Sequence, residues 1–351
     1  MEGQPSAEHM VSHKEAPKQG ESLGRKTVEV NGRVWSYLEY GNPKGIPILE
    51  VHGWGGAGAE GNDWFSRAFA GEVINSSGLQ TLARNKPESA QSLANTIRSL
   101  EGKYHIIVPE LPGSGVTEPL ERISINNLVD ELAEFAKATN MKGSIAVGNS
   151  AGGIYVTKLA ARHPELETKA VVLEGTMTRP SDMDKMLYLL SQVITFGPIP
   201  NILIKFGLDK KLWAFALKKS KDYQVASEEI KKWMLEATMR GDSKTTVKLL
   251  REIGRDIGEN IKKVECPVVV LDGAHGDMVP ILKQAKQATR FHPEISPNSE
   301  KIAQRKMVFL PIGGKAGEQG HGILSDFPEG LVALIDTSLN KMITQDQNSS
   351  G

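Results

Sequence analysis

The sequence has little cysteine, no net charge and no long unbroken apolar run, and each of these features excludes some classes of protein. Its one cysteine, Cys266, cannot form an internal disulfide, which favours a reducing compartment, and we expect a cytoplasmic protein. Lys and Arg number 42, as do Asp and Glu, so no basic excess predicts a nucleic-acid partner. Residues 1–25 lack the apolar segment of a signal peptide, and their polar composition predicts a disordered tail.

One apolar stretch, residues 186–207, approaches the length of a membrane span. Gly197, Pro198 and Pro200 interrupt it. We therefore expect buried helices here rather than a membrane contact.

The pattern of apolar residues predicts an α/β protein. Residues 26–41 form two alternating runs around Asn31-Gly32, a dipeptide typical of a type I′ hairpin turn. Six short apolar runs then alternate with helical patterns, at 46–51, 104–110, 144–149, 169–175, 267–273 and 306–312. This order predicts a mostly parallel sheet with helices on both faces.

Two insertions interrupt this alternation and define the expected domain organisation. Residues 177–262 carry amphipathic helical patterns and no strand, which predicts a helical cap. The cap divides the core domain into residues 26–176 and 263–345. The first part contains an insert at about 71–102, which is polar and has no strong hydrophobic period. Residues 346–351 are expected to form a flexible C-terminus. Apolar residues of the cap are expected mainly to pack its helices and in part to line a pocket: Leu187, Leu190, Ile194, Phe196, Ile199, Leu203, Phe206, Trp213 and Phe215.

The stretch VGNSAGG at 147–153 places a serine between an apolar run and a helical pattern. In a tight strand-to-helix turn, side chains two residues before and after Ser150 would collide, which accounts for Gly148 and Gly152. Parallel sheets bind ligands at the carboxyl ends of their strands, and the following helix directs its first amides to the same place. The stretch therefore predicts that Ser150 is a nucleophile.

A nucleophilic serine requires donors for the developing oxyanion. The run at 46–51 ends in the glycine-rich loop HGWGGAGAEG. In this fold class, such a loop and the residue after the serine supply the two amides. We expect these to be the N–H groups of Trp54 and Ala151.

Five segments together carry a family resemblance: HGWGG at 52–56, PELPGSG at 109–115, GNSAGG at 148–153, ECPVVVLDGAHGDMVP at 265–280 and QGHGILSDFPEGLVALI at 319–335. In order and character they resemble the conserved loops of the α/β-hydrolase fold family, in a serine-nucleophile member that bears a cap. The resemblance covers residues 26–345. It implies that Ser150 is the nucleophile, His321 the general base and Asp277 the carboxylate that orients the histidine.

Three carboxylates are candidates for the acid of the triad, with Asp277 ranked first. The family usually places its aspartate three residues after the strand-end glycine, whereas Asp277 lies four residues after Gly273. Glu174, at the end of the preceding strand, is the second candidate and Asp272 the third. His275 and Asp277 alone would make an incomplete metal site, so no metal and no cofactor are expected.

The function expected from the sequence is hydrolysis of a carboxylic ester or thioester of a small to medium hydrophobic molecule, through an acyl-enzyme on Ser150. Asn149 resembles the residue before the serine in hydrolases that cleave carbon–carbon bonds, so that reaction stays an alternative. An acyltransferase with the same triad and a non-catalytic ligand receptor are the others. The sequence makes no prediction of oligomeric state.

Overall fold

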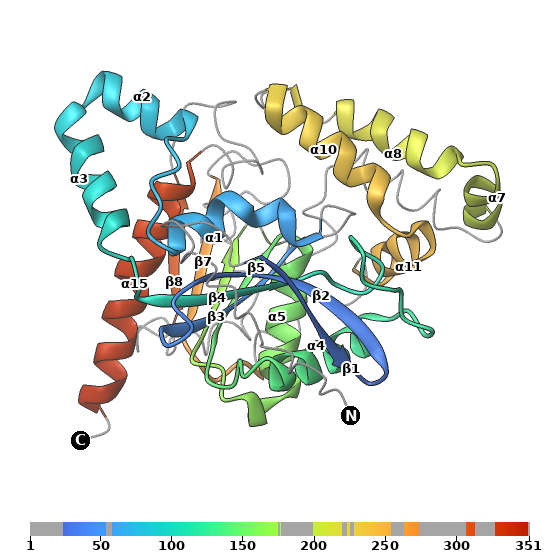
Figure 1. The fold of residues 1–351 in the computed structure, drawn as a ribbon, viewed down its shortest axis with the longest axis horizontal. Coiled ribbons are helices and arrows are strands. Elements are labelled where there is room, and N and C mark those ends of the chain that lie inside the picture. Colours follow the sequence, from blue (N-terminus) through green and yellow to red (C-terminus); the bar gives the residue numbers. More distant parts are fainter. Residues whose placement is uncertain are drawn as a thin grey trace, which may run out of the picture.

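The computed structural model describes residues 24–53, 58–174, 176, 199–219, 223–224, 228–253, 263–273, 307–312 and 327–349. Its centre is one eight-stranded sheet in the order β1-β2-β4-β3-β5-β6-β7-β8 (Figure 1). The strands are β1 (Arg25–Val30), β2 (Arg33–Gly41), β3 (Ile46–Val51), β4 (Tyr104–Pro109), β5 (Ile145–Asn149), β6 (Ala170–Glu174), β7 (Val268–Gly273) and β8 (Met307–Ile312). All eight lie where the apolar runs predicted them, so the α/β prediction is confirmed.

The antiparallel part of the sheet is the N-terminal hairpin. Asn31 and Gly32 connect β1 to β2 with φ of 51° and 75°, the two positive values that a type I′ turn requires. Strand β2 also pairs antiparallel with β4, and every later pair is parallel. The carboxyl ends of β3 to β8 therefore meet at one edge, where the loops that follow them can form a common site.

Successive residues of the central strands pack on opposite faces of the sheet. In β5, Ala146 joins the hydrophobic cluster on one face, and Ile145 and Val147 join the cluster on the other. Helices α4 (Ile125–Ala138) and α5 (Ala151–Arg162) cover the first face. Helices α1 (Asp63–Phe69), α3 (Pro87–Arg98) and α15 (Pro328–Ser349) cover the second. Two short 3-10 helices are also present, η1 (Gly58–Asn62) and η2 (Pro164–Leu166).

The insert at 71–102 contains two helices that the sequence did not indicate, α2 (Ser77–Asn85) and α3. Its apolar stripe is short and rich in alanine, with Leu79, Ala90, Ala94 and Ile97 buried. Ser76 caps α2 and also donates to the buried carboxylate of Glu329, with an Oγ to Oε2 distance of 2.5 Å. The contact to Glu329, far away in the sequence, anchors the insert beside α15 (Figure 1).

Between β6 and β7 the described residues form α7 (Ile199–Lys205), α8 (Leu208–Lys219), α10 (Glu228–Arg240) and α11 (Ser243–Ile253). These helices stand together to one side above the sheet (Figure 1). Trp213 is buried in the core cluster, as expected for a packing residue, and Leu203 packs against it. The expectation of burial is wrong for Phe206 and Phe215, which are exposed, and also for Ile202 within the apolar run 186–207. Leu187, Leu190, Ile194 and Phe196 lie outside the described residues.

Within the described part of the chain, no helix is both long and apolar enough to cross a bilayer.

Candidate active site

Ser150 sits in a strained turn at the centre of the sheet's carboxyl edge. It lies between β5 and α5 with φ of 52° and ψ of −118°, a left-handed backbone that is costly for a residue with a Cβ. The amide of Ser150 donates to the carbonyl of Glu174 at 2.8 Å, and the amide of Gly153 donates to the carbonyl of Ser150 at 3.1 Å. The neighbouring strand and the new helix thus hold the serine in this conformation.

The glycines around Ser150 are required by contact with neighbouring backbone. A Cβ on Gly148 would lie 2.4 Å from the nitrogen of Gly153, and a Cβ on Gly152 would lie 2.1 Å from the carbonyl oxygen of Val51. Both distances are below 3.0 Å, a separation at which Cβ atoms essentially never make non-bonded contacts. The steric requirement inferred from the sequence is therefore confirmed: α5 begins against β3 and β5 at a distance that only glycine permits.

Two amides are relevant to an oxyanion at this turn. Ala151 is the first residue of α5, so its N–H has no acceptor within the helix. The loop after β3 passes directly beside the serine, since a Cβ on Gly53 would come within 3.0 Å of the Cβ of Ser150. Trp54, the other expected donor, follows Gly53 and lies outside the described residues.

His52 is a structural residue of this loop. Its Nε2 accepts from the amide of Leu111 at 3.2 Å, so the proton of the neutral ring is on Nδ1, which donates to the carbonyl of Gly53 at 2.8 Å. Burial lowers the pKa of the imidazole, which keeps the ring neutral. Because both ring nitrogens form hydrogen bonds, His52 ties the loop after β3 to the loop after β4.

A polar pair lies next to the serine on its β6 side. Asn149 and Glu174 are register partners in the parallel ladder, and Asn149 Nδ2 donates to Glu174 Oε2. The Glu174 side chain is buried. Oδ1 of Asn149 faces the other way, toward Gly53, where an added Cβ would lie 3.1 Å from it. The sequence drew attention to both residues separately but did not indicate that they bond.

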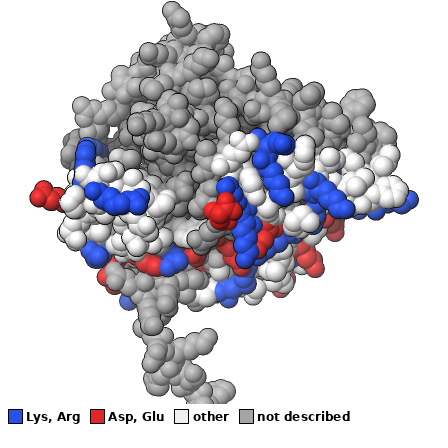
Figure 2. All heavy atoms as spheres, turned by 90° about the horizontal axis from the view of Figure 1, so that it is seen from above, with Lys and Arg blue, Asp and Glu red and all other residues white. Residues whose placement is uncertain are grey.

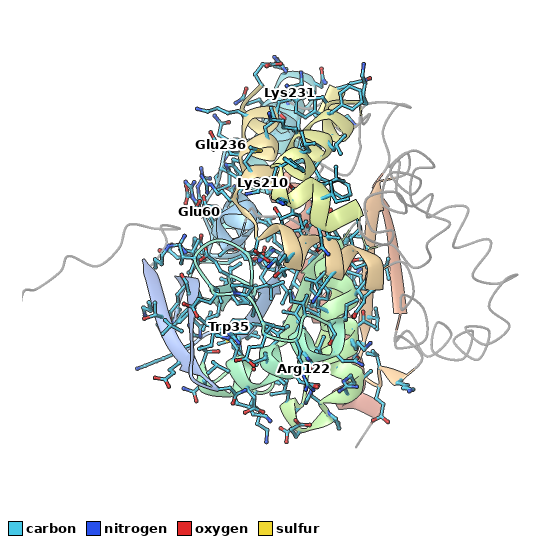
Figure 3. The ribbon with its side chains drawn as sticks, turned by 90° about the vertical axis from the view of Figure 1, so that its right-hand side faces the viewer. Trp35, Glu60, Arg122, Lys210, Lys231 and Glu236 are labelled. Atoms are coloured by element: carbon cyan, nitrogen blue, oxygen red, sulfur yellow. The ribbon has the colours of Figure 1, made fainter. Side chains whose placement is uncertain are left out.

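Glu110, in the loop after β4, is also a structural residue. Its buried carboxylate pairs with Arg25 at 2.6 Å and accepts from the amide of Val116 at 3.0 Å. Arg25 also reaches Glu60 of η1, which in turn pairs with Arg240 of α10 at 2.6 Å. Figure 3 shows Glu60 just below the helices that carry Lys210 and Glu236, with Trp35 deeper in the sheet layer.

The loop after β4 is also joined to α11. The amide of Asp242 donates to the carbonyl of Gly113 at 2.9 Å, and Gly113 packs so closely on Thr245 that a Cβ would lie 2.6 Å from its Oγ1. The helices at 228–253 are thus fixed beside the edge of the sheet that carries Ser150.

The remaining predicted site residues are only partly placed. Asp277 and His321 lie outside the described residues, and Asp272 is placed on β7 without a described side chain. Ser150, Ala151 and Glu174 are the predicted residues that the structure brings together. Among the described residues, no group of three or more His, Cys, Asp or Glu side chains is arranged to hold a metal ion.

The parallel sheet, the glycine-bounded serine turn and the adjoining glycine loop define an α/β-hydrolase enzyme. The chain belongs to the family described as Hydrolase_4, serine aminopeptidase S33, whose model matches residues 87–300, more than half of the chain. No curated protein matches it significantly.

Solved structures share the fold at low sequence identity. An esterase from Rhodococcus sp. ECU1013 aligns with a TM-score of 0.60 at 17% identity, over 91% of this chain and all of that one. A putative lipase from Acinetobacter baumannii AYE gives 0.58 at 19%, over 93% of each chain. A mutant meta-cleavage product hydrolase from Pseudomonas fluorescens IP01 gives 0.55 at 16%, over 90% and 97%.

The strain at Ser150 predicts an unusual order of stabilities. Because φ is positive there, we expect Ser150→Gly to be more stable than Ser150→Ala by about 1 kcal/mol. Ser92 is the matched control, since it is exposed in the middle of α3, and there the alanine variant should be the more stable one by roughly 0.5–1 kcal/mol. Urea unfolding of the four variants measures both differences. The same order at the two positions would contradict strain at Ser150.

Burial of neutral His52 predicts a pH-dependent stability. The unfolded imidazole takes up a proton below about pH 6.5, whereas the folded ring, with its lowered pKa, does not. Stability is therefore complete above that pH and falls as the pH decreases, at up to about 1.4 kcal/mol per pH unit for one proton. His52→Asn keeps a donor toward Gly53 and removes the titration. In urea unfolding between pH 8 and 5 the variant should lose less stability than the wild type, and parallel curves would refute the assignment.

Proposed function

We propose that the protein is a serine hydrolase that cleaves a carboxylic ester or thioester of a small to medium hydrophobic molecule through an acyl-enzyme on Ser150. The observation that carries this proposal is the strained turn at Ser150, held between β3, β5 and β6 at the carboxyl edge of the sheet. An ordinary connection has no need of a backbone that costs roughly 1–3 kcal/mol. At an active site, the same turn presents the serine oxygen to a substrate beside unpaired amides.

The proposed reaction has two matched halves. His321 takes the proton of the Ser150 hydroxyl, Oγ bonds to the carbonyl carbon, and the amides of Ala151 and Trp54 hold the oxyanion. The bond to the alcohol or thiol then breaks, and His321 gives that leaving group the proton. Water, activated by His321, adds to the acyl carbon and releases the acid and free Ser150. Asp277 orients His321 and stabilises its charged form.

The cap at 177–262 is proposed to select the substrate. Its helices α10 and α11 are tied to the loops after β3 and β4 by Glu60–Arg240 and Gly113–Asp242. They therefore stand beside the entrance that any substrate of Ser150 would use. The balanced charge of the chain agrees with a neutral, hydrophobic small-molecule ester.

A carbon–carbon bond hydrolase is the second candidate. The bond from Asn149 to the buried Glu174 places a polar amide beside Ser150, and a meta-cleavage product hydrolase is among the structures that share the fold. The same serine and histidine would act on a dienol ketone instead of an ester.

The nucleophile is tested with a fluorophosphonate probe and intact mass, alongside turnover of p-nitrophenyl esters of graded chain length. Wild type should gain one adduct and cleave medium-chain esters better than short, charged ones. Ser150→Ala should lose the adduct and about 10⁴-fold or more of turnover. Ser144→Ala is the matched control, because Ser144 precedes β5 and lies at the opposite end of that strand from Ser150.

Other substrates separate the alternatives in the same assay. A dienol ketone tests carbon–carbon cleavage, an alcohol acceptor tests acyl transfer, and an aminoacyl p-nitroanilide tests the activity for which the family is described. Folded wild-type protein that neither labels nor turns over any of them would refute the proposal and favour a ligand receptor.

The identity of the acid is tested by amide substitutions. Asp277→Asn should reduce turnover by about 10⁴-fold, as loss of the orienting carboxylate does in other triads. Glu174→Gln keeps an acceptor oxygen near Asn149 and should cost far less. The reverse order would assign the role to Glu174, and turnover of both variants over the pH range would show which carboxylate holds the histidine.

A further inference from the structure

Helices α7 and α8 present apolar side chains to solvent. The exposed fractions are 51% for Ile202, 66% for Phe206, 41% for Leu208 and 61% for Phe215. Ile202 and Phe206 are four residues apart on and just after α7, and Leu208 and Phe215 are seven apart on α8, about 10 Å along the helix. We call these four residues the outer apolar face. Scattered exposed apolar residues are ordinary, but four between residues 202 and 215 are a local concentration.

Lysines surround this face. The segment 199–219 contains five lysines, at positions 205, 210, 211, 218 and 219, and a single acid, Asp209, which is buried. Lys210 donates to the carbonyl of Met239 on α10 at 2.6 Å, and the other four lysines are exposed. Lys205 lies over the ring of Phe206 and Lys219 over that of Phe215, with Nζ 5.9 Å and 5.8 Å from the ring centroids. Seen from above, Lys and Arg side chains are set among uncharged ones over this side of the molecule (Figure 2).

The neighbouring helix α10 shows that this charge is local. It carries Glu228, Glu229 and Glu236 against Lys231, Lys232 and Arg240 and so has no net charge. The lysines of α7 and α8 are therefore a property of the face that carries the exposed aromatic residues.

From this combination we propose that the outer apolar face docks onto a membrane surface that contains anionic lipid. Aromatic and aliphatic side chains flanked by lysine are the composition of helices that lie in the interface plane, with the apolar groups among the acyl chains and the ammonium groups at the phosphates. Neither helix spans the bilayer in this arrangement. This inference does not depend on the reaction at Ser150.

For the described part of the stretch 186–207, the proposal takes the membrane contact that the sequence analysis set against buried helices. A protein partner of this face would need acidic side chains opposite the four exposed lysines, whereas an anionic bilayer supplies phosphates at any spacing. The net positive charge of the segment 199–219 therefore favours the bilayer.

The test is flotation of the full-length protein with phosphatidylcholine vesicles, with and without phosphatidylglycerol. Wild type should bind the anionic vesicles, bind neutral ones at least tenfold more weakly, and lose most of the difference in 0.5 M NaCl. Phe206→Ser/Phe215→Ser should weaken binding at least about tenfold. Val34→Ser/Leu334→Ser, exposed elsewhere on β2 and α15, should leave it unchanged.

A charge-matched pair isolates the lysines. Lys211→Gln/Lys218→Gln should weaken binding to anionic vesicles by about fivefold per lysine, whereas Lys44→Gln/Lys86→Gln, with the same net charge, should not. Circular dichroism and thermal unfolding establish that each variant is folded. Wild type that stays unbound, or equal binding by the paired variants and their controls, overturns the proposal. A concentration-dependent dimer that Phe206→Ser/Phe215→Ser abolishes, without vesicle binding, would assign the face to a second copy instead.

Discussion

The close approach of α5 to β3 and β5 is the constraint on which the site depends. Gly152 stands where a Cβ would overlap the carbonyl of Val51, and Gly148 where one would overlap the backbone of Gly153. With the helix so close, the chain has one residue in which to reverse direction, and that residue is Ser150, at positive φ. The strain is therefore a consequence of packing between glycines, and the buried sheet beneath supplies the stability that offsets it.

The strands were predictable because the burial of each strand determines the pattern of apolar residues within it. A short β-branched run, buried on both faces, can be recognised without knowledge of its neighbours, and all six such runs became strands. The two strands of the hairpin were recognised instead by alternation around Asn31-Gly32. The helices of the insert were not predictable in the same way. Half of their buried apolar positions are alanines, and the contact that anchors them, from Ser76 to Glu329, joins residues far apart in the sequence.

In the candidate site, too, local features could be predicted and contacts between distant segments could not. The turn at Ser150 and Ala151 could be predicted from local spacing, because it is encoded within five residues. The bond from Asn149 to Glu174 depends on the register between β5 and β6, and the tautomer of His52 depends on the amide of Leu111 in another loop. Relations of this kind arise only when the strands are aligned, so a single sequence shows the groups but not their pairing.

The helices between β6 and β7 carry more apolar residues than packing against the core requires. Trp213 of α8 and Leu249, Leu250 and Ile253 of α11 join the core cluster and account for the inner side. Phe215 lies two residues after Trp213 on the same helix but is exposed. Positions two apart in a helix point to different faces, so Phe215 does not share the buried face of Trp213. An aromatic residue kept in water gains nothing from the folded state alone, since its transfer free energy is realised only on burial. The outer apolar face of α7 and α8 therefore calls for a second surface, whereas their inner side is already explained by the fold.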